Sequence, residues 1–373
     1  MRNTPVGLLV LWFAVCAPRA ATQQSSESPP ARAAQDSGAE RTSSLVPFPF
    51  FFYTPETSTA FGVTLLYYFG GPASGDRIQP SLVQPTFIYT LKKQIIVSAK
   101  GDLFLDGGRR RLLAEASFMR FPNTFWGIGN DAPESAEEDY TPRLFNGSLQ
   151  LLREVASGWY VGGTAQFVHR ELVETKENGL LARDDIPGTR DGRAVSLGIW
   201  IVRDTRDNTV NPRLGSYHQM RAALYDGLLG SEYDFASYSV DLRRYVTIGP
   251  DQVLALQALW TAMTATPPFD LLPGLGGEVL LRGYFAGRYR DRNLLAFQGE
   301  YRLPLWWRFG AVGFLGVGQV ARDVRDFGPG DFWTSGGVGL RFLLSPEEGL
   351  NLRADFGIGQ SSTGLYLTMA EAF

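Results

Sequence analysis

The sequence predicts an all-β protein: a closed antiparallel transmembrane β-barrel of about sixteen strands. Three observations predict it. Apolar and polar residues alternate with a period of two along runs of about ten residues, so each strand has one apolar and one polar face. Charged residues recur in the middle of the polar face, which suits a water-filled lumen. Aromatic residues cluster at strand ends, where their polar edges favour the headgroup level of a membrane.

Residues 233–247 show the alternation clearly. One face carries Ala236, Tyr238, Val240 and Leu242, and the other carries Ser237, Ser239, Asp241 and Arg243. A soluble β-sandwich has the same period, so the alternation alone leaves both folds open. The aromatic strand ends, an N-terminal export signal and a final strand that ends on Phe373 favour the membrane barrel.

The composition excludes several classes of protein. After the first two dozen residues no run reaches about 18 apolar residues, so membrane-spanning helices are not expected. The formal net charge of −3 gives no reason to expect a nucleic-acid partner. The only cysteine, Cys16, lies in the expected leader, so the rest of the chain has no disulfide and no cysteine metal site. We expect no cofactor and no metal.

The N-terminus reads as an export signal over residues 1–21. Arg2 precedes an apolar stretch at 6–15, and small residues for cleavage follow it. A lipoprotein signal through Cys16 is the alternative. Residues 22–44 are rich in Ser, Ala, Pro and Gln, so we expect a disordered spacer there. The barrel is then expected over residues 45–373, in the outer membrane of a bacterium.

Sixteen strands can be placed along this region, with fourteen or eighteen as alternatives. We expect them at 47–55, 58–69, 80–91, 94–105, 110–128, 140–155, 159–173, 193–204, 215–226, 233–247, 252–264, 291–304, 309–321, 333–344, 350–359 and 364–373. If the first strand starts in the periplasm, the long connections face outside, at 129–139, 174–192, 267–290 and 322–332. The opposite connections are short apart from 205–214. Long outer loops and short inner turns are typical of such barrels.

One outer connection, 267–290, carries a motif within GGEVLLRGYFAGRYRDRN: Leu281, Arg282, Gly283 and Tyr284. Further along the chain stand VRDTRDNTVNPRLGSY, FQGEYRLPL, GGVGLRF, SPEEGLNLRADFGIG and GLYLTMAEAF. With these segments in this order, residues 45–373 resemble the BamA/TamA-type barrels of the bacterial surface antigen superfamily. The resemblance implies that the sixth extracellular loop folds back into the lumen, where its arginine pairs with acidic residues of the wall.

The residues themselves permit this arrangement. Gly283 allows a turn or a close backbone approach, and a guanidinium can grip carboxylates through parallel hydrogen bonds. Because side chains alternate between the two faces of a strand, this parity places four residues in the lumen, where we expect them to be partners of the loop: Glu300, Arg341, Arg353 and Asp355. We therefore expect Arg282 to pair with Asp355, Glu300 or both. An exposed loop arginine is the simpler alternative from the sequence alone.

The terminal strand is a second candidate site. Gly364, Tyr366, Leu367 and Phe373 belong to an amphipathic strand with an aromatic end. Such a strand resembles the signal by which the insertion machinery recognises barrel substrates. Parity places Tyr366 in the lumen and places Leu367, Glu371 and Phe373 on the lipid face. Gly357, Gly359 and Gly364 lie near this strand and would weaken the packing of the seam between the first and last strands.

An enzyme is not expected. The chain has only two histidines, His169 and His218, and parity places both on the lipid face, away from any Ser–Asp partner set. Two histidines on different strands also make a poor metal site.

The resemblance to the BamA/TamA type implies a role in outer-membrane biogenesis, by insertion or translocation of protein or lipid. The expected partners are outer-membrane lipid, barrel-protein or lipid substrates, and the insertion machinery for the chain's own assembly. Members of that family carry periplasmic POTRA domains of about 75 residues, which the roughly 25 residues before the barrel cannot supply, so we expect none here. A plugged or gated channel for small solutes and a surface structural protein are the alternatives.

Overall fold

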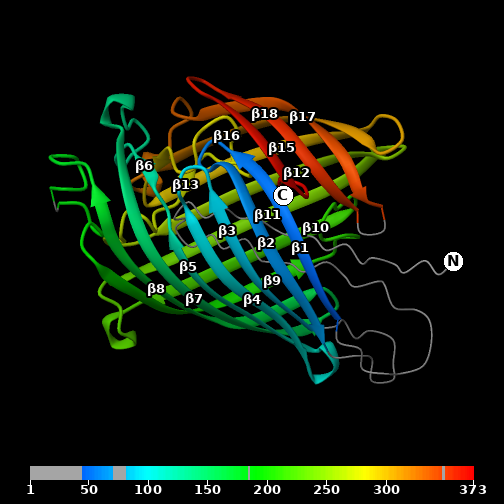
Figure 1. Cartoon of the computed structure of the whole chain (residues 1–373), viewed down its shortest axis with the longest axis horizontal. Helices are drawn as coiled ribbons and strands as arrows, with labels where there is room; N and C mark the ends of the chain where they lie inside the picture. Colours follow the sequence, from blue (N-terminus) through cyan, green and yellow to red (C-terminus); the bar gives the residue numbers. More distant parts are fainter. Residues whose placement is uncertain (1–43, 70–80, 184, 347–348) are drawn as a thin grey trace.

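The protein is a closed, nearly all-β barrel (Figure 1). The structure, a computed structural model, describes residues 44–69, 81–183, 185–346 and 349–373. Antiparallel pairing runs from each strand to the next and returns from β19 to β1, so the sheet closes on itself. Closure removes free edges, which lipid could not satisfy with hydrogen bonds. The expected signal at 1–21 and almost all of the spacer at 22–44 lie outside the described residues.

The barrel strands alternate in direction around the wall. Their bounds are β1 (Ser44–Thr54), β2 (Ser58–Phe69), β3 (Ser81–Thr90), β4 (Ile95–Leu105), β5 (Arg110–Arg120), β6 (Asn123–Phe125), β7 (Glu138–Ala156), β8 (Trp159–Thr175), β9 (Gly192–Asp204), β10 (Gly215–Tyr225), β11 (Phe235–Gly249), β12 (Gln252–Met263), β15 (Asn293–Pro304), β16 (Phe309–Ala321), β17 (Trp333–Ser345), β18 (Leu350–Gly359) and β19 (Thr363–Met369). A two-residue hairpin, β13 (Gly274–Leu275) with β14 (Tyr289–Arg290), lies apart from the wall.

The prediction of sixteen strands is confirmed, with one interruption. β5 and β6 both pair with β7 in a single line. The two residues between them, Phe121 and Pro122, belong to neither strand, although the Phe121 N–H still donates to the Pro142 carbonyl at 3.1 Å. Proline has no N–H to donate to the ladder, which accounts for the break. The expected strand at 110–128 is therefore one wall strand in two pieces.

The two faces of the wall follow the alternation in the sequence. Along β11, Ser237, Ser239, Asp241 and Arg243 are buried toward the lumen. Tyr238 and Leu242 face outward and are 42% and 39% exposed. Large apolar side chains are exposed in the same way around the barrel, as a surface in contact with acyl chains requires.

The connections divide by length between the two rims. We call the rim that carries the long loops 126–137, 176–191, 264–292 and 322–332 the loop rim, and the opposite rim the turn rim. The described turn-rim connections are short, at 106–109, 157–158, 250–251 and 305–308, apart from 205–214. The sixth loop-rim connection, residues 264–292, is named loop 6.

The C-terminus departs from the expected strand. β19 ends at Met369, and Ala370 adopts a positive φ of 63°. This turn sends the last residues, named the C-terminal tail (370–373), into the lumen, where Glu371 and Phe373 are 3% and 2% exposed. The expectation that Glu371 and Phe373 face lipid is wrong, because parity holds only as long as the strand continues.

The described residues contain four single-turn 3₁₀ helices and no longer helix. None of their helices has the length and apolar character needed to span a bilayer.

Candidate functional site: loop 6 and the luminal ion cluster

Loop 6 packs inside the barrel against the wall. Leu275, Leu281 and Tyr284 of the loop are nearly fully buried and share an apolar cluster with Leu294 on β15 and Val320 on β16. Burial of these side chains offsets the entropy lost when a long loop is fixed in one place. The packing directs the loop tip at Arg282 toward the centre of the wall formed by β15–β18.

The loop tip has an unusual backbone. Leu281 and Gly283 have φ values of +50° and +117°. At Gly283 a side chain would also collide with β18, because a Cβ there would lie 2.7 Å from the Gly359 nitrogen. Glycine is the residue that permits both the positive φ and this close approach. The tip therefore lies directly on the inner wall with the Arg282 side chain extended from it.

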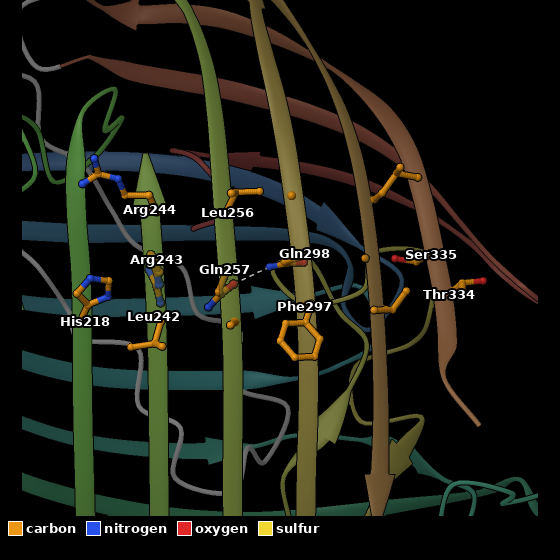
Figure 2. Close-up of a pocket in the computed structure, with 15 residues that line it drawn as sticks. His218, Leu242, Arg243, Arg244, Leu256, Gln257, Phe297, Gln298, Thr334 and Ser335 are labelled. Atoms are coloured by element: carbon orange, nitrogen blue, oxygen red, sulfur yellow. Dashed lines mark hydrogen bonds between the residues drawn. The ribbon is translucent and has the colours of Figure 1, made fainter. Parts of the chain in front are cut away.

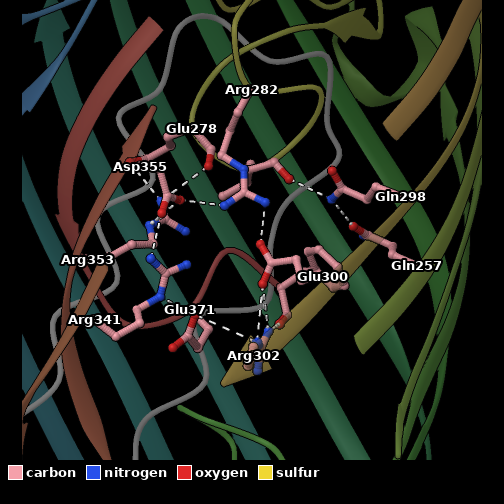
Figure 3. Close-up of polar contacts among 12 residues, drawn as sticks. Gln257, Glu278, Arg282, Gln298, Glu300, Arg302, Arg341, Arg353, Asp355 and Glu371 are labelled. Atoms are coloured by element: carbon pink, nitrogen blue, oxygen red, sulfur yellow. Dashed lines mark hydrogen bonds and ion pairs between the residues drawn. The ribbon is translucent and has the colours of Figure 1, made fainter. Parts of the chain in front are cut away.

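Arg282 connects loop 6 to two strands (Figure 3). Its Nη1 donates to Asp355 on β18 and its Nη2 donates to Glu300 on β15. All three side chains are at most 1% exposed. The guanidinium also lies over the Phe314 ring, 3.6 Å from its centroid. The sequence left open a pairing of Arg282 with Asp355, Glu300 or both, and in the structure it contacts both.

The charges of Glu300 and Asp355 also keep Arg282 protonated. Burial lowers the pKa of Arg282, but the charges of Glu300 and Asp355 raise it by more, so its pKa lies above the ordinary value of an arginine. Arg282 is therefore a permanent cation in a water-poor site.

A second set of residues neutralises the two carboxylates from the turn-rim side. Arg341 donates to Asp355 at 2.5 Å and to Glu371 at 2.8 Å. Arg302 donates to Glu300 at 3.1 Å through Nη2, and its Nε is 3.8 Å from Glu371. The tail residue Glu371 thus belongs to the same network as the loop tip. Arg341, expected to contact the loop, braces Asp355 and Glu371 instead.

Arg353 reaches loop 6 at a different point. Its Nη2 donates to the Glu278 carbonyl oxygen at 3.2 Å and is 3.7 Å from the Glu278 carboxylate. Its Nε donates to Thr368 on β19 at 2.9 Å and is 3.4 Å from Asp355. Arg353 therefore joins loop 6 to Thr368 of the last strand.

These eight side chains form what we call the ion cluster: Arg282, Arg302, Arg341, Arg353, Glu278, Glu300, Asp355 and Glu371. Four arginines face four carboxylates, and every member is at least nine-tenths buried. Buried ions are tolerated when paired and hydrogen-bonded, and removing one partner from such a network is costly. The cluster ties β15, β17, β18, loop 6 and the C-terminal tail together.

Two tyrosines fix the backbone of the tip. The Tyr366 hydroxyl accepts from the Gly283 N–H at 3.0 Å and donates to the Tyr284 carbonyl at 3.3 Å. The Tyr284 hydroxyl donates to the Thr334 carbonyl and accepts from the Gln360 N–H, each at 2.8 Å. β19 therefore binds loop 6 directly, and Tyr366, singled out as part of a terminal signal, has a structural partner in the folded barrel.

Glycines of β18 make room for the loop. A Cβ at Gly357 would lie 2.6 Å from the Arg282 carbonyl carbon, and a Cβ at Gly359 would lie 2.5 Å from the Tyr284 ring. The parity that places Asp355 in the lumen also places both of these residues there. They do more than weaken the seam: they form a shallow slot that receives the loop tip. A run of lumen-facing glycines was the sequence signal for this slot.

Loop 6 also contacts the first turn of the barrel. The Glu56 carboxylate, between β1 and β2, accepts from the Ala286 N–H at 2.7 Å. Burial raises the pKa of Glu56, while its hydrogen bonds, including the one from Ala286, and the charge of Lys92 act in the opposite direction. No sequence pattern singled out Glu56, because its partner is a backbone amide 230 residues away.

Other candidates lie elsewhere. Leu367 sits at the seam, opposite Tyr53 of β1, and Gly364 pairs with Gly357. His169 is exposed and His218 is half-buried, both on the outward face of their strands. Among the described residues there is no group of three or more His, Cys, Asp or Glu side chains placed to hold a metal ion.

A model of the Omp85 superfamily domain matches residues 81–369. Among solved structures the chain is similar to BamA from Haemophilus ducreyi lacking POTRA domains 1–3, with a TM-score of 0.62 and 12% identity over 89% of this chain and 70% of that one. It is also similar to CdiB from Acinetobacter baumannii, with a TM-score of 0.54 and 15% identity over 89% and 60% of the two chains. CdiB from Escherichia coli is similar with a TM-score of 0.56 and 11% identity, over 90% of this chain and 64% of that one.

A search of curated protein sequences gave no match. At these identities the likeness to solved structures shows the fold, and the chain spans less than two thirds of either CdiB chain.

Proposed function

Since the chain belongs to the Omp85 superfamily, we propose that this outer-membrane barrel inserts or translocates protein or lipid, and that it does so by opening the seam between β1 and β19. In this proposal the loop rim faces outside and the turn rim faces the periplasm. The chain reaches the membrane through its N-terminal signal. We propose that this activity needs neither a cofactor nor a catalytic residue.

The seam is the observation that carries the proposal. β1 and β19 share one paired position, Tyr53 with Leu367, whereas β1 pairs with β2 over its whole length from Ser44 to Thr54. A strand edge with few ladder hydrogen bonds costs little to separate. Once separated, it can pair with an incoming strand by β-augmentation. A substrate strand would then enter the membrane with its backbone already hydrogen-bonded.

Loop 6 supports the proposal by its position beside the seam. Tyr366 and Thr368 of β19 contact loop 6 directly or through Arg353. The ion cluster then holds β19 in the closed arrangement from inside while the seam itself remains weak. Substrates of this barrel would be extended amphipathic strands of other outer-membrane proteins, or lipid that passes along the open seam.

The C-terminal strand has a role before folding. In the folded barrel Phe373 is buried and its carbonyl accepts from Arg302 at 3.0 Å. Recognition of the terminal aromatic residue by the insertion machinery therefore belongs to the unfolded chain, and burial of the tail marks completion of the barrel.

A disulfide across the seam tests the proposal. The only native cysteine, Cys16, lies outside the described residues, so the pair Tyr53→Cys and Leu367→Cys can be oxidised selectively. Cα partners in a ladder lie within the range that a disulfide can bridge. We expect the locked barrel, reconstituted in vesicles, to lose at least ten-fold in the rate of substrate-barrel insertion, and reduction to restore it.

The matched control is the pair Val63→Cys and Phe87→Cys, which are Cα partners on β2 and β3. This lock leaves the seam free and should leave insertion unchanged. Full insertion activity with the seam locked would overturn the proposal.

A channel for small solutes is the second candidate. The luminal wall carries a polar row that includes Gln219, Asp241, Gln257 and Gln298, linked by hydrogen bonds. Such a lining suits water and ions once the lumen is cleared. Rapid solute uptake by vesicles that contain the wild-type barrel, unaffected by the seam lock, would favour the channel.

A further inference from the structure

An apolar groove crosses the outer face of the wall (Figure 2). Its volume is about 660 Å³, and it runs across β10, β11, β12, β15, β16 and β17. One side follows a continuous line of paired residues that includes His218, Leu242, Ala258 and Phe297. The other side is built by Arg244, Leu256 and Leu315. Since these positions face outward, the groove opens toward the acyl chains.

Small residues hollow the groove between large ones. Three large side chains project from the wall: Leu256 (43% exposed), Phe297 (44%) and Leu315 (74%). Ala258 and Gly299 lie among them and leave the floor low. The line spans five inter-strand spacings, roughly 24 Å at about 4.8 Å each. This is long enough for one extended acyl chain, since two opposed chains make up a hydrocarbon core of about 30 Å.

One end of the groove is basic. Arg203 on β9 is the Cα partner of His218, and Arg244 lies two residues beyond Leu242, the other partner of His218. All three side chains face outward close to the turn rim. Neither arginine side chain forms an ion pair or hydrogen bond with any described residue, and Arg203 instead lies over the Trp159 ring at 5.5 Å.

The chemistry of this end selects the ligand. Arginine on a lipid-facing surface is destabilising in hydrocarbon and is tolerated near the headgroups. Trp159 marks that level, because indole rings favour the interface. Two unpaired guanidiniums beside an imidazole attract a phosphate, which arginine binds through parallel hydrogen bonds. A ligand that fits both parts has an anionic phosphate head and a long acyl chain.

We propose that this groove is a binding site for an anionic phospholipid of the periplasmic leaflet, with the phosphate at Arg203, His218 and Arg244 and one acyl chain along Leu242, Ala258 and Phe297. The site is on the opposite side of the wall from the ion cluster, and its headgroup end, on β9–β11, is remote from the seam in the strand order. It is independent of whether the barrel inserts substrates or conducts solutes.

Native mass spectrometry of the full chain in detergent tests the site, with dioleoyl phosphatidylglycerol as the probe. We expect the double variant Arg203→Gln/Arg244→Gln to bind it at least ten-fold more weakly, and Arg203→Lys/Arg244→Lys to recover most of the affinity. Ala258→Trp, which fills the groove floor without touching the charges, should also weaken binding. Arg153→Gln, an exposed outward-facing arginine near the same rim on β7, is the matched control and should bind normally.

Three results would overturn the proposal. If phosphatidylcholine with the same acyl chains binds as tightly as phosphatidylglycerol, the basic end of the groove does not recognise an anionic headgroup. If Ala258→Trp binds phosphatidylglycerol as tightly as the wild type does, the acyl chain does not lie in the groove. Tighter binding of lipid A than of phosphatidylglycerol, lost in the double arginine variant, would assign the site to the other leaflet. The altered residues face outward, so heat-modifiable mobility in gels, which reports a folded barrel, should be retained by every variant.

Discussion

Arg282 is the residue on which the position of loop 6 depends. It is the only member of the ion cluster that binds both Glu300 and Asp355, and those carboxylates lie on strands that do not pair with each other. Its Nε has no hydrogen-bond partner in the structure. The two carboxylate contacts and the Phe314 ring thus account for its place in the lumen.

Replacing Arg282 by alanine leaves two buried carboxylates short of a cation. We expect Arg282→Ala to reduce the free energy of unfolding by about 3–5 kcal/mol, the range for breaking a buried ion pair. Urea unfolding from lipid vesicles measures the change. Arg292→Ala is the control, because that arginine pairs with an Asp323 side chain that is 64% exposed, and exposed pairs contribute about 1 kcal/mol or less. Equal effects of the two substitutions would show that the buried cluster does not stabilise the barrel.

Glu56 gives the loop a pH dependence. Burial raises the pKa of its carboxyl above the ordinary 4.5, so the folded state holds the proton more tightly than the unfolded chain does. The stabilisation from the protonated form is complete below the ordinary pKa and is lost as the pH rises through the raised folded-state pKa. The barrel should therefore lose part of its stability as the pH rises above about 4.5 and through the raised folded-state pKa of Glu56.

Glu56→Gln tests this dependence. A glutamine oxygen can still accept from the Ala286 N–H but does not titrate. We expect the unfolding free energy of the variant to fall less with rising pH than that of the wild type, in parallel urea titrations. Identical pH profiles would show that Glu56 titrates with the same pKa in both states.

At the scale of elements, β18 is shaped by the loop that it receives. Valine is more favourable than glycine in most strands. At position 357, however, a Cβ would lie 2.6 Å from the Arg282 carbonyl carbon, so a larger residue would collide with the loop. We expect Gly357→Val to destabilise the barrel by about 1–3 kcal/mol through overpacking, measured by urea unfolding. Gly313→Val on β16 is the control, because a Cβ there meets nothing within 4 Å and should cost less than about 0.5 kcal/mol. A neutral Gly357→Val would mean that the loop tip does not rest on β18.

The elements also show what the sequence could and could not predict. The period of two placed Asp355, Glu300 and Arg353 in the lumen because a regular strand admits only two faces. The same rule failed at Glu371 and Phe373, because one residue with positive φ, Ala370, ends the strand and carries no warning in its own type. Contacts such as Glu56 with Ala286 join a side chain to a distant backbone amide, so no residue pattern indicates them.

At the scale of the whole molecule the lumen is closed at two levels. Loop 6 fills the middle from the loop rim. Near the turn rim, Val210 of the long turn 205–214 packs against Leu350 and Ala370, although β9 and β10 are not neighbours of β18 and β19 in the sheet. The C-terminal tail lies beside this turn, with Phe373 against Tyr245 and Ala255 on the far wall.

Arg302 joins the two levels. It binds Glu300 of the ion cluster, and at the turn rim its Nη1 donates to the Pro212 carbonyl at 3.3 Å and its Nη2 to the Phe373 carbonyl at 3.0 Å. Removing its side chain leaves both the turn and the tail without this anchor. Single substitutions can therefore loosen the two levels separately: one can free loop 6, and another can free the turn 205–214 and the C-terminal tail.

Two closures in series predict a specific pattern of conductance in planar bilayers. Arg282→Ala frees loop 6 but leaves the turn rim closed, and Arg302→Ala does the reverse, so each alone should raise single-channel conductance little. The double variant should raise it by far more than the sum of the two single effects, since current through barriers in series is limited by whichever remains. Arg243→Ala serves as the control, because Arg243 binds Asp241 on its own strand and holds neither closure. A large conductance in Arg282→Ala alone would mean that loop 6 is the whole barrier and that the turn and tail leave an open path.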